Sequence, residues 1–228
     1  ELYWPCSIAF DSKDNVYISD EYTNLISIFD KDGNFIKRWG TKGQVEGCIN
    51  FPSGIDIDDK DHIYLADNMN DRIQVFSLDG EFIKTWGKEG HGEGEFDKPW
   101  GIKVYGDKVL VADWRNGRVQ IFDKEGNFLA KFGDGNNEEE SLFRPSDVAI
   151  DKNNYYYVCD WGKQRIQIYD NNFKFCGFLR GEATLSEWAK EYLDANNDER
   201  LARESFVPLI KVDEVEPHEE SARIESFF

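Results

Sequence analysis

The chain has 228 residues, of which 40% are hydrophobic and 15% aromatic, enough to build a globular core. It holds no run of about 18 apolar residues, which excludes a membrane-spanning helix. Its 45 acidic and 27 basic residues give a formal net charge of −18, which argues against nucleic acid or an anionic membrane as a general partner.

Two residue types repeat four times along the chain. An aspartate recurs at intervals of 47, 46 and 47 residues, at Asp20, Asp67, Asp113 and Asp160. A proline stands fourteen or fifteen residues before each of them, at Pro5, Pro52, Pro99 and Pro145. Two independent markers with one period indicate a repeat architecture.

Each repeat reads as four short strands separated by polar turns. The first repeat contains PCSIAF, VYISD, LISIF and NFIKRWG; the second contains PSGIDI, IYLAD, RIQVF and EFIKTWG. The third contains PWGIKV, VLVAD, RVQIF and NFLAKFG, and the fourth PSDVAI, YYVCD, RIQIY and the degenerate KFCGFLRG. This pattern predicts an all-β fold, a β-propeller of four-stranded antiparallel blades at about 1–46, 47–93, 94–139 and 140–181.

Residues 1–181 resemble the NHL repeat family of β-propellers, whose pattern runs P-x-G-I, A-D, N-x-R-I-Q-V-F and G-x-F. The second repeat matches best, through Pro52, Gly54, Ile55, Ala66, Asp67, Arg72, Ile73, Gln74, Val75 and Phe76. The resemblance implies about six blades. We therefore expect the four repeats to be part of a longer ring, with additional blades or self-association covering the open sheet edges.

Two repeats depart from the pattern. Leu25 and Ser27 stand where the other repeats have arginine and glutamine. Phe173 replaces the turn glycine of the earlier repeats, Gly33, Gly80 and Gly126. Because glycine is the usual residue in a left-handed turn position, we expect the turn of the fourth repeat to be built differently.

Residues 182–228 carry no blade pattern and hold 13 acidic and 5 basic residues. Thr184 and Glu187 have the spacing of a capping box, and an apolar stripe follows at helical spacing, at Leu185, Trp188, Ala189, Tyr192 and Leu193. We expect an acidic α-helical insertion here, with a solvated strap at 211–220 that leads towards a further blade.

The repeated aspartates and the arginines five residues after three of them, Arg72, Arg118 and Arg165, are interpreted as structural. A residue that recurs once per blade performs a task common to all blades. We expect the carboxylate to bind backbone N–H groups of the link between the second and third strands, and the arginine to pair near the blade boundary.

A channel-centred enzyme is the alternative function, lyase-like or lactonase-like and completed by blades outside this segment. The three histidines, His62, His91 and His218, do not begin an inner strand, where the channel of a propeller is lined. No catalytic residue, zinc site or cofactor is predicted. Asp147 is the one channel candidate, because it replaces Ser7, Gly54 and Gly101 of the other repeats, and it could hold a cation such as calcium.

Two further features are interpreted as structural. The glycines of 88–95 lack the strand-to-helix turn of a phosphate loop, so we expect a flexible connection between blades. The four cysteines, Cys6, Cys48, Cys159 and Cys176, lack metal-ligand spacing and read as buried free thiols. Unpaired thiols slightly favour a cytoplasmic location, and an extracytoplasmic location is the alternative.

Binding is the favoured function. In a propeller, the links between second and third strands and those between blades emerge on one face. We expect a protein, peptide or glycan to bind there, with large aromatic side chains as anchors, through Tyr22, Met69, Trp100, Trp114, Arg115, Trp161 and Lys163. An RNA-binding propeller with a local basic rim at Arg115, Arg144 and Lys163 is the third alternative.

Overall fold

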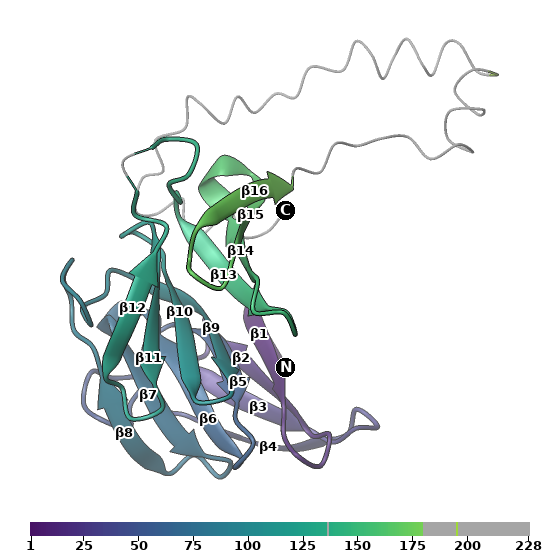
Figure 1. Ribbon diagram of the computed structural model, residues 1–228. Helices are drawn as coiled ribbons and strands as arrows, with labels where there is room; N and C mark the ends of the chain where they lie inside the picture. Colours follow the sequence, from purple (N-terminus) through teal and green to yellow (C-terminus); the bar gives the residue numbers. More distant parts are fainter. Residues whose placement is uncertain (136, 180–194, 196–228) are drawn as a thin grey trace. The chain divides into compact units, whose positions relative to one another are not determined.

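The computed structural model describes residues 1–135, 137–179 and 195, and its strands form four separate four-stranded antiparallel sheets (Figure 1). Blade 1 contains β1 (Pro5–Phe10), β2 (Val16–Asp20), β3 (Leu25–Phe29) and β4 (Phe35–Trp39). Blade 2 contains β5 (Pro52–Ile57), β6 (His62–Asp67), β7 (Arg72–Ser77) and β8 (Phe82–Trp86). Blade 3 contains β9 (Pro99–Tyr105), β10 (Lys108–Asp113), β11 (Arg118–Asp123) and β12 (Phe128–Phe132). Blade 4 contains β13 (Pro145–Ile150), β14 (Tyr156–Asp160), β15 (Arg165–Tyr169) and β16 (Phe175–Leu179).

The predicted all-β propeller fold is confirmed, and the repeated prolines explain how its inner strands begin. Each proline is the first residue of an inner strand, β1, β5, β9 or β13, where a missing N–H costs little. The ladder to the neighbouring strand shifts register beside each proline. Such a bulge changes the direction of the side chains that follow it at the start of the strand.

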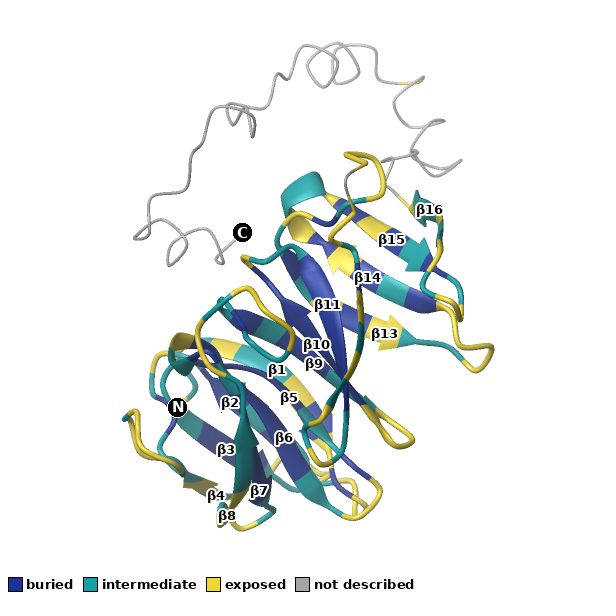
Figure 2. Cartoon of the chain, turned by 60° about the vertical axis from the view of Figure 1, so that its left-hand side comes forward, coloured by how far each residue is buried: buried dark blue, intermediate teal, exposed yellow. Residues whose placement is uncertain are grey.

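The hydrophobic core lies between blades rather than within them. Three clusters of buried residues each draw on two successive blades, and the inner strands of neighbouring blades are in contact. An apolar residue of each connection between blades is also buried, namely Ile49, Phe96 and Leu142. Figure 2 shows buried positions along β6, β10 and β11, and exposed positions on β13 and β14.

The turn of blade 4 is built like those of the other blades, so the prediction of a different turn was wrong. Phe173 adopts φ 62° and donates its backbone N–H to the Asp170 carbonyl at 3.0 Å, as Gly33 does to Asp30. Its ring stacks on Phe132 with centroids 5.3 Å apart and planes at 4°. In blade 2 the indole of Trp39 occupies the corresponding space over Gly80. The smaller Phe132 leaves room for the second ring.

Two short 3-10 helices, η1 (Asn68–Asn70) and η2 (Trp161–Lys163), follow β6 and β14. Glu1–Gly181 forms one compact unit. The expected helix near Thr184 and the strap at 211–220 lie outside the described residues. None of the described helices is long and apolar enough to cross a membrane.

Candidate functional site: the loop face

Two kinds of link meet on one face of the blades, which we call the loop face. The link between second and third strands bonds to the connection that precedes the same blade. The backbone bonds run from Glu21 N to Trp4 O (2.9 Å), Met69 N to Asn50 O (3.1 Å), Arg115 N to Asp97 O (3.0 Å) and Gly162 N to Phe143 O (2.9 Å). Side chains from distant parts of the sequence are thereby brought together.

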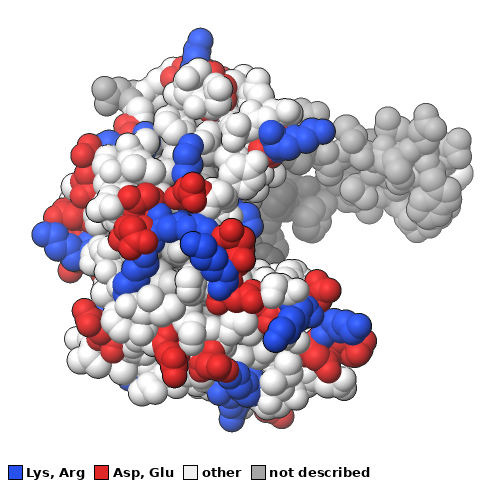
Figure 3. All heavy atoms as spheres, turned by 60° about the horizontal axis from the view of Figure 1, so that its bottom comes forward, with Lys and Arg blue, Asp and Glu red and all other residues white. Residues whose placement is uncertain are grey.

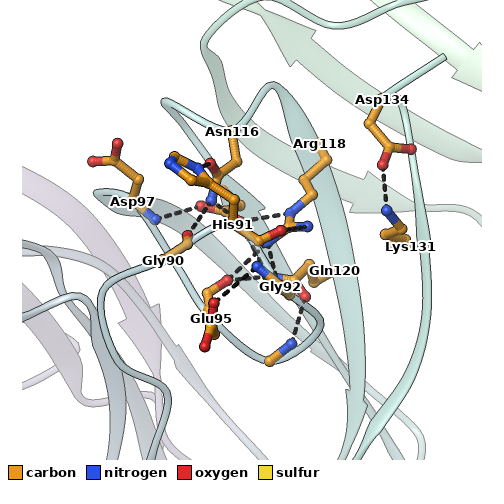
Figure 4. Close-up of polar contacts among 12 residues, drawn as sticks. Gly90, His91, Gly92, Glu95, Asp97, Asn116, Arg118, Gln120, Lys131 and Asp134 are labelled. Atoms are coloured by element: carbon orange, nitrogen blue, oxygen red, sulfur yellow. Dashed lines mark hydrogen bonds and ion pairs between the residues drawn. The ribbon is translucent and has the colours of Figure 1, made fainter. Parts of the chain in front are cut away.

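A buried ionic network supports this face in blade 3 (Figure 4). Arg118 Nε donates to Asp113 Oδ2 at 2.8 Å, and Gln120 Nε2 donates to the same oxygen at 3.0 Å. The remaining guanidinium nitrogens bond to the carbonyls of His91, Gly92 and Glu95 at 2.7–2.9 Å. These bonds tie the arginine to the connection that precedes its blade, which supports the structural interpretation.

Blades 2 and 4 repeat this network, with Arg72 Nε 2.7 Å from Asp67 Oδ2 and Arg165 Nε 2.9 Å from Asp160 Oδ2. The prediction that the aspartate accepts from backbone N–H groups of the link between the second and third strands was wrong for blades 2, 3 and 4. The carboxylates accept from the connection between blades, through the N–H groups of Asn50, Asp97 and Phe143 at 2.6, 2.9 and 2.7 Å. Burial raises the pKa of Asp67 and Asp113, and these bonds partly offset that effect.

In blade 1 the repeated aspartate, Asp20, is hydrogen-bonded without an arginine at the equivalent position, where Leu25 stands. The N–H and the hydroxyl of Thr23 both donate to Asp20 Oδ1 at 2.9 Å, and Tyr3 N–H donates to the other oxygen at 2.6 Å. Thr23 lies in the link between the second and third strands, so the backbone donor of blade 1 comes from the link that was predicted for all blades. A local turn therefore replaces the long guanidinium where Leu25 stands.

The glycine-rich connection before blade 3 is held by hydrogen bonds, in contrast to the flexible link expected there. Glu95 accepts from Gly92 N–H at 2.9 Å and pairs with Lys88 at 3.1 Å. Gly94 N–H donates to Gln120 at 3.0 Å, and Asn116 donates to the Gly90 carbonyl at 2.9 Å. The connection is thus part of the rigid surface of the loop face.

Three tryptophans form a row across blades 3 and 4. Ring centroids are 5.9 Å apart for Trp100 and Trp114, and 6.4 Å apart for Trp114 and Trp161. The guanidinium of Arg144 lies 4.8 Å from the Trp114 ring, and that of Arg115 lies 5.9 Å from it. Trp114 is 8% exposed and Trp161 is 47% exposed. Trp114 therefore holds the row together, and Trp161 is its accessible end.

A second aromatic cluster lies on the loop face of blade 1. The ring of Tyr22 is 5.1 Å from Trp4 and 5.6 Å from Tyr3, and both tyrosines are exposed. Met69 is exposed on η1 of blade 2. Each of the first three blades therefore contributes at least one large side chain to this face.

The channel candidate Asp147 lies on β13, paired with Cys159 and directly beside Gly101. The residue is exposed, but desolvation still raises the pKa of its carboxyl. The Val148 N–H and the charge of Lys103 partly offset this rise. Burial and the carboxylates of Glu21 and Asp147 raise the pKa of the Cys6 thiol to about 12. Within the described residues, no group of three or more His, Cys, Asp or Glu side chains could hold a metal ion.

The described histidines lie away from the inner-strand starts. His62 Nδ1 is 3.5 Å from Asp58 Oδ2 beside the turn that precedes β6, and His91 Nδ1 is 2.5 Å from Asn116 Oδ1. His218 lies outside the described residues. All four cysteines are free. Cys6 and Cys48 are partly buried, whereas Cys159 and Cys176 are exposed, so the expectation of buried thiols was wrong for Cys159 and Cys176 and is met only in part by Cys6 and Cys48.

A sequence family described as 6-bladed beta-propeller matches residues 7–86 and 93–185. The chain belongs to this family. No curated protein matches it. Among solved structures, this propeller is similar to virginiamycin B lyase from Staphylococcus aureus, with 14% identity and a TM-score of 0.59, over 78% of this chain and 56% of that chain. It is also similar to the nidogen/laminin complex, with 18% identity and a TM-score of 0.60, over 80% and 66%.

A third similar structure is a protein of unknown function from Bacteroides caccae, with 15% identity and a TM-score of 0.56, over 79% of this chain and 62% of that chain. The chain spans less than two thirds of the length of each of these structures. At such identities the likeness shows the propeller fold.

The propeller brings together four of the predicted binding residues, Trp100, Trp114, Arg115 and Trp161, in one row. Tyr22 and Met69 lie on the same face but outside this row. Lys163 is a tether, because its ammonium donates to the Ser141 carbonyl at 3.0 Å and to the Glu138 carbonyl. Sequence reasoning left Phe143 and Tyr3 out of the binding set. Their positions just before the inner-strand prolines could have indicated them.

Proposed function

We propose that this chain is a non-catalytic, NHL-type β-propeller scaffold that binds a protein, peptide or glycan partner through its loop face. The observation that carries the proposal is the row formed by Trp100, Trp114 and Trp161 together with Arg144. Tryptophan and arginine dominate the binding energy of many interfaces, because tryptophan buries a large area and arginine both stacks on aromatic rings and donates several hydrogen bonds.

The side chains of the row have different tasks. Trp161 is half exposed and offers its ring to a partner, whereas Trp114 is buried and positions both Trp161 and Arg144. Tyr22 and Met69 extend the contact area over blades 1 and 2. The hydrogen-bonded connections below hold these groups in place before binding, which lowers the entropic cost of association.

The NHL type of the repeats is part of this proposal. It is supported by the motif of blade 2, in which Asp67, Arg72 and Gln74 join in one network. We also propose that additional blades or a second copy of the chain cover the exposed faces of blades 1 and 4. The repeat chemistry supports this, since equivalent faces in blades 2 and 3 are buried by a neighbour.

The test is binding of the full chain to peptide and glycan arrays, with Trp161→Ala as the variant. We expect the binding free energy for captured ligands to weaken by about 2 kcal/mol, while the melting temperature stays close to that of the wild type. Tyr105→Ala is the matched control, because Tyr105 is 38% exposed at the far end of the inner strand β9. An equal loss in both variants, or no loss at Trp161, contradicts the proposal.

Trp114→Ala separates anchoring from packing. Because Trp114 is 8% exposed, we expect this variant to lower the free energy of unfolding by about 3 kcal/mol, and to weaken binding only through disorder of the row. Chemical denaturation measures the first effect. A variant that folds normally but binds poorly would instead make Trp114 a direct anchor.

A further inference from the structure

The outer strand of one blade packs an aromatic side chain on a turn of the next blade. An added Cβ on Gly80 would lie 2.5 Å from the Trp39 ring, and one on Gly126 would lie 2.8 Å from the Trp86 ring. Trp39 also contacts Phe76 beside that turn, with ring centroids 5.0 Å apart. A glycine in the turn between third and fourth strands therefore leaves the space that a tryptophan of the preceding blade fills.

The same turns carry an acidic residue that pairs with a lysine of the preceding outer strand. Lys37 of β4 pairs with Asp79, and Lys84 of β8 pairs with Glu125 at 3.0 Å. Each lysine stands two residues before the tryptophan of its strand, so both side chains point to the same side of the sheet. On the side of the molecule seen in Figure 3, Lys and Arg side chains lie directly beside Asp and Glu. A Lys-x-Trp strand thus packs on an acidic residue followed by glycine.

The boundary between blades 3 and 4 shows that the two sides change together. Phe132 stands in place of the tryptophan and Phe173 in place of the glycine, and their rings stack with centroids 5.3 Å apart. Ala130 occupies the lysine position and Asn172 the acidic position. The residues of a turn therefore indicate which outer strand packs on it.

Blade 1 carries the acidic residue and the glycine, but no outer strand of the described chain packs on them. No described atom lies within 4 Å of a Cβ added to Gly33, and the exposed Asp32 side chain pairs with no described residue. Phe29 is only partly buried, whereas its equivalents in blades 2 and 3 are 0% exposed. Ile8 and Phe10, on one side of β1, are 54% and 58% exposed. We call these five residues the open face of blade 1.

We infer that the open face of blade 1 binds a β-strand that carries a lysine and, two residues later, a tryptophan, supplied by a propeller blade other than the four of residues 1–181. The indole packs over Gly33 and Phe29, and the lysine pairs with Asp32. Burial of the indole provides most of the affinity, and the exposed ion pair provides specificity. This inference rests on the proposal that further blades or a second copy cover the exposed faces, and it selects a further blade.

A second copy of the chain is the less suitable occupant. The outer strand of its blade 4, β16, has Gly177 and Leu179 at the lysine and tryptophan positions, so it offers neither an ammonium nor an indole. The outer strands that do carry Lys-x-Trp, β4 and β8, already pack on blades 2 and 3 of the same chain. The open face of blade 1 therefore fits an outer strand of a different sequence.

The experiment presents the full chain with disulfide-cyclised hairpin peptides, and fluorescence polarisation measures their affinity. The first hairpin copies residues 72–87, which contain Lys84 and Trp86 in the required spacing. We expect Trp86→Ala in this hairpin to weaken binding at least ten-fold and Lys84→Glu to weaken it about five-fold. A hairpin of residues 165–180, with glycine and leucine at these positions, should bind no better than the alanine peptide.

Gly33→Phe tests the site in the chain, because it fills the space with a ring as Phe173 does in blade 4. We expect this variant to bind the tryptophan hairpin at least ten-fold more weakly. Gly106→Phe is the matched control, since Gly106 also has a positive φ, +57°, and open space around an added Cβ, but lies in the β9–β10 turn. An equal loss in both variants would indicate backbone strain and would overturn the inference.

Asp32→Lys tests the ion pair by charge reversal. We expect it to weaken the lysine hairpin about five-fold and to strengthen the Lys84→Glu hairpin about five-fold, because the two charges are then exchanged. Asp107→Lys is the control, since Asp107 is exposed in the β9–β10 turn of blade 3, and it should change both affinities less than two-fold.

Four other outcomes overturn the inference: no hairpin binding at the highest soluble concentration, equal affinity of the tryptophan and alanine hairpins, insensitivity to Asp32→Lys, or self-association of the chain in sedimentation velocity that Gly33→Phe abolishes. The last would make a second copy the occupant. Binding at the loop face has a separate measurement, because its ligands should lose affinity on Trp161→Ala and keep it on Gly33→Phe. If the hairpins fail while that pattern holds, loop-face binding stands without this docking site.

Discussion

Blades 2 and 3 lie between neighbours, whereas blades 1 and 4 each have a neighbour on one side in the described structure. The same repeat position has a different environment in the two cases. Ile73 of blade 2 and Val119 of blade 3 are 0% exposed, and Ile166 of blade 4 is 37% exposed. On the opposite face, Ile55 of blade 2 is 2% exposed and Ile8 of blade 1 is 54% exposed.

This difference shows that a blade does not have a core of its own. Its apolar positions are identical in type along the chain, but each becomes buried only when the next blade covers it. Fully burying an isoleucine contributes about 1.5–3 kcal/mol, so an end blade gains less stability from the same sequence than an internal blade. The comparison predicts where substitutions act strongly and where they act weakly.

The largest effect is expected in the ionic network that blade 3 has and blade 1 lacks. Replacing Arg118 by Leu, the residue that blade 1 carries at this position, leaves the buried Asp113 carboxylate without its guanidinium. We expect the free energy of unfolding to fall by about 3–5 kcal/mol at neutral pH, measured by denaturant titration.

The pH dependence of that variant provides a control. Burial already raises the pKa of Asp113, and removal of Arg118 raises it further. A group whose pKa is raised in the folded state favours folding when it is protonated, so the deficit should shrink as the pH falls through the folded-state pKa. A deficit that stays constant with pH would point to lost packing of the arginine stem instead.

The second-largest change in the free energy of unfolding is expected at Ile73, and Ile166 is its counterpart in blade 4. Ile73→Ala should lower the free energy of unfolding by about 3 kcal/mol, because it leaves a cavity between blades 2 and 3. Ile166→Ala should cost less than about 1 kcal/mol if the outer face of blade 4 meets water. Equal losses would mean that a further blade or a second copy covers Ile166 in solution, and analytical ultracentrifugation would distinguish these two.

A smaller effect is expected at the turns between the third and fourth strands of a blade, which contact an aromatic side chain of the previous blade. Gly126 has φ +89°, and an added Cβ would lie 2.8 Å from the Trp86 ring. Gly126→Phe should therefore destabilise the protein by about 2 kcal/mol, whereas Phe173→Gly in blade 4 should cost about 1 kcal/mol for the lost ring stacking. The double variant Phe132→Trp with Phe173→Gly should recover the stability if the pair Trp and Gly is equivalent to the pair Phe and Phe.

The smallest effect concerns metal ions. Asp147 is where blade 4 departs from the glycines of blades 2 and 3, but it forms no ligand cluster with other described residues. We expect neither calcium nor a chelator to shift the melting temperature by more than about 1 °C, and elemental analysis to find no stoichiometric zinc. One tightly held transition metal per chain would favour the enzyme alternative.

Much of the fold could be predicted because the propeller is built from local signals. The repeated proline and aspartate mark the start of each inner strand and the end of each second strand, and short alternating segments form strands wherever a turn follows. Recurrence of the aspartate and the arginine from blade to blade, as at Asp113 and Arg118, also indicated a structural task. Part of the tryptophan row could be predicted as well, since Trp161 stands in a link that reaches the loop face and Trp100 directly follows an inner-strand proline.

Exposure and pairing were decided by the tertiary structure, because they depend on residues from another blade or connection. Trp114 and Trp161 occupy equivalent links, yet one is buried by Trp100 and Arg144 and the other is half exposed. The backbone N–H donor to Asp113, that of Asp97, comes from the connection before the blade, which no spacing along the chain reveals. Phe173 accepts a left-handed backbone because Phe132, in the previous blade, leaves space for its ring. A repeat determines the local geometry of each blade, and packing between blades determines what each side chain contacts.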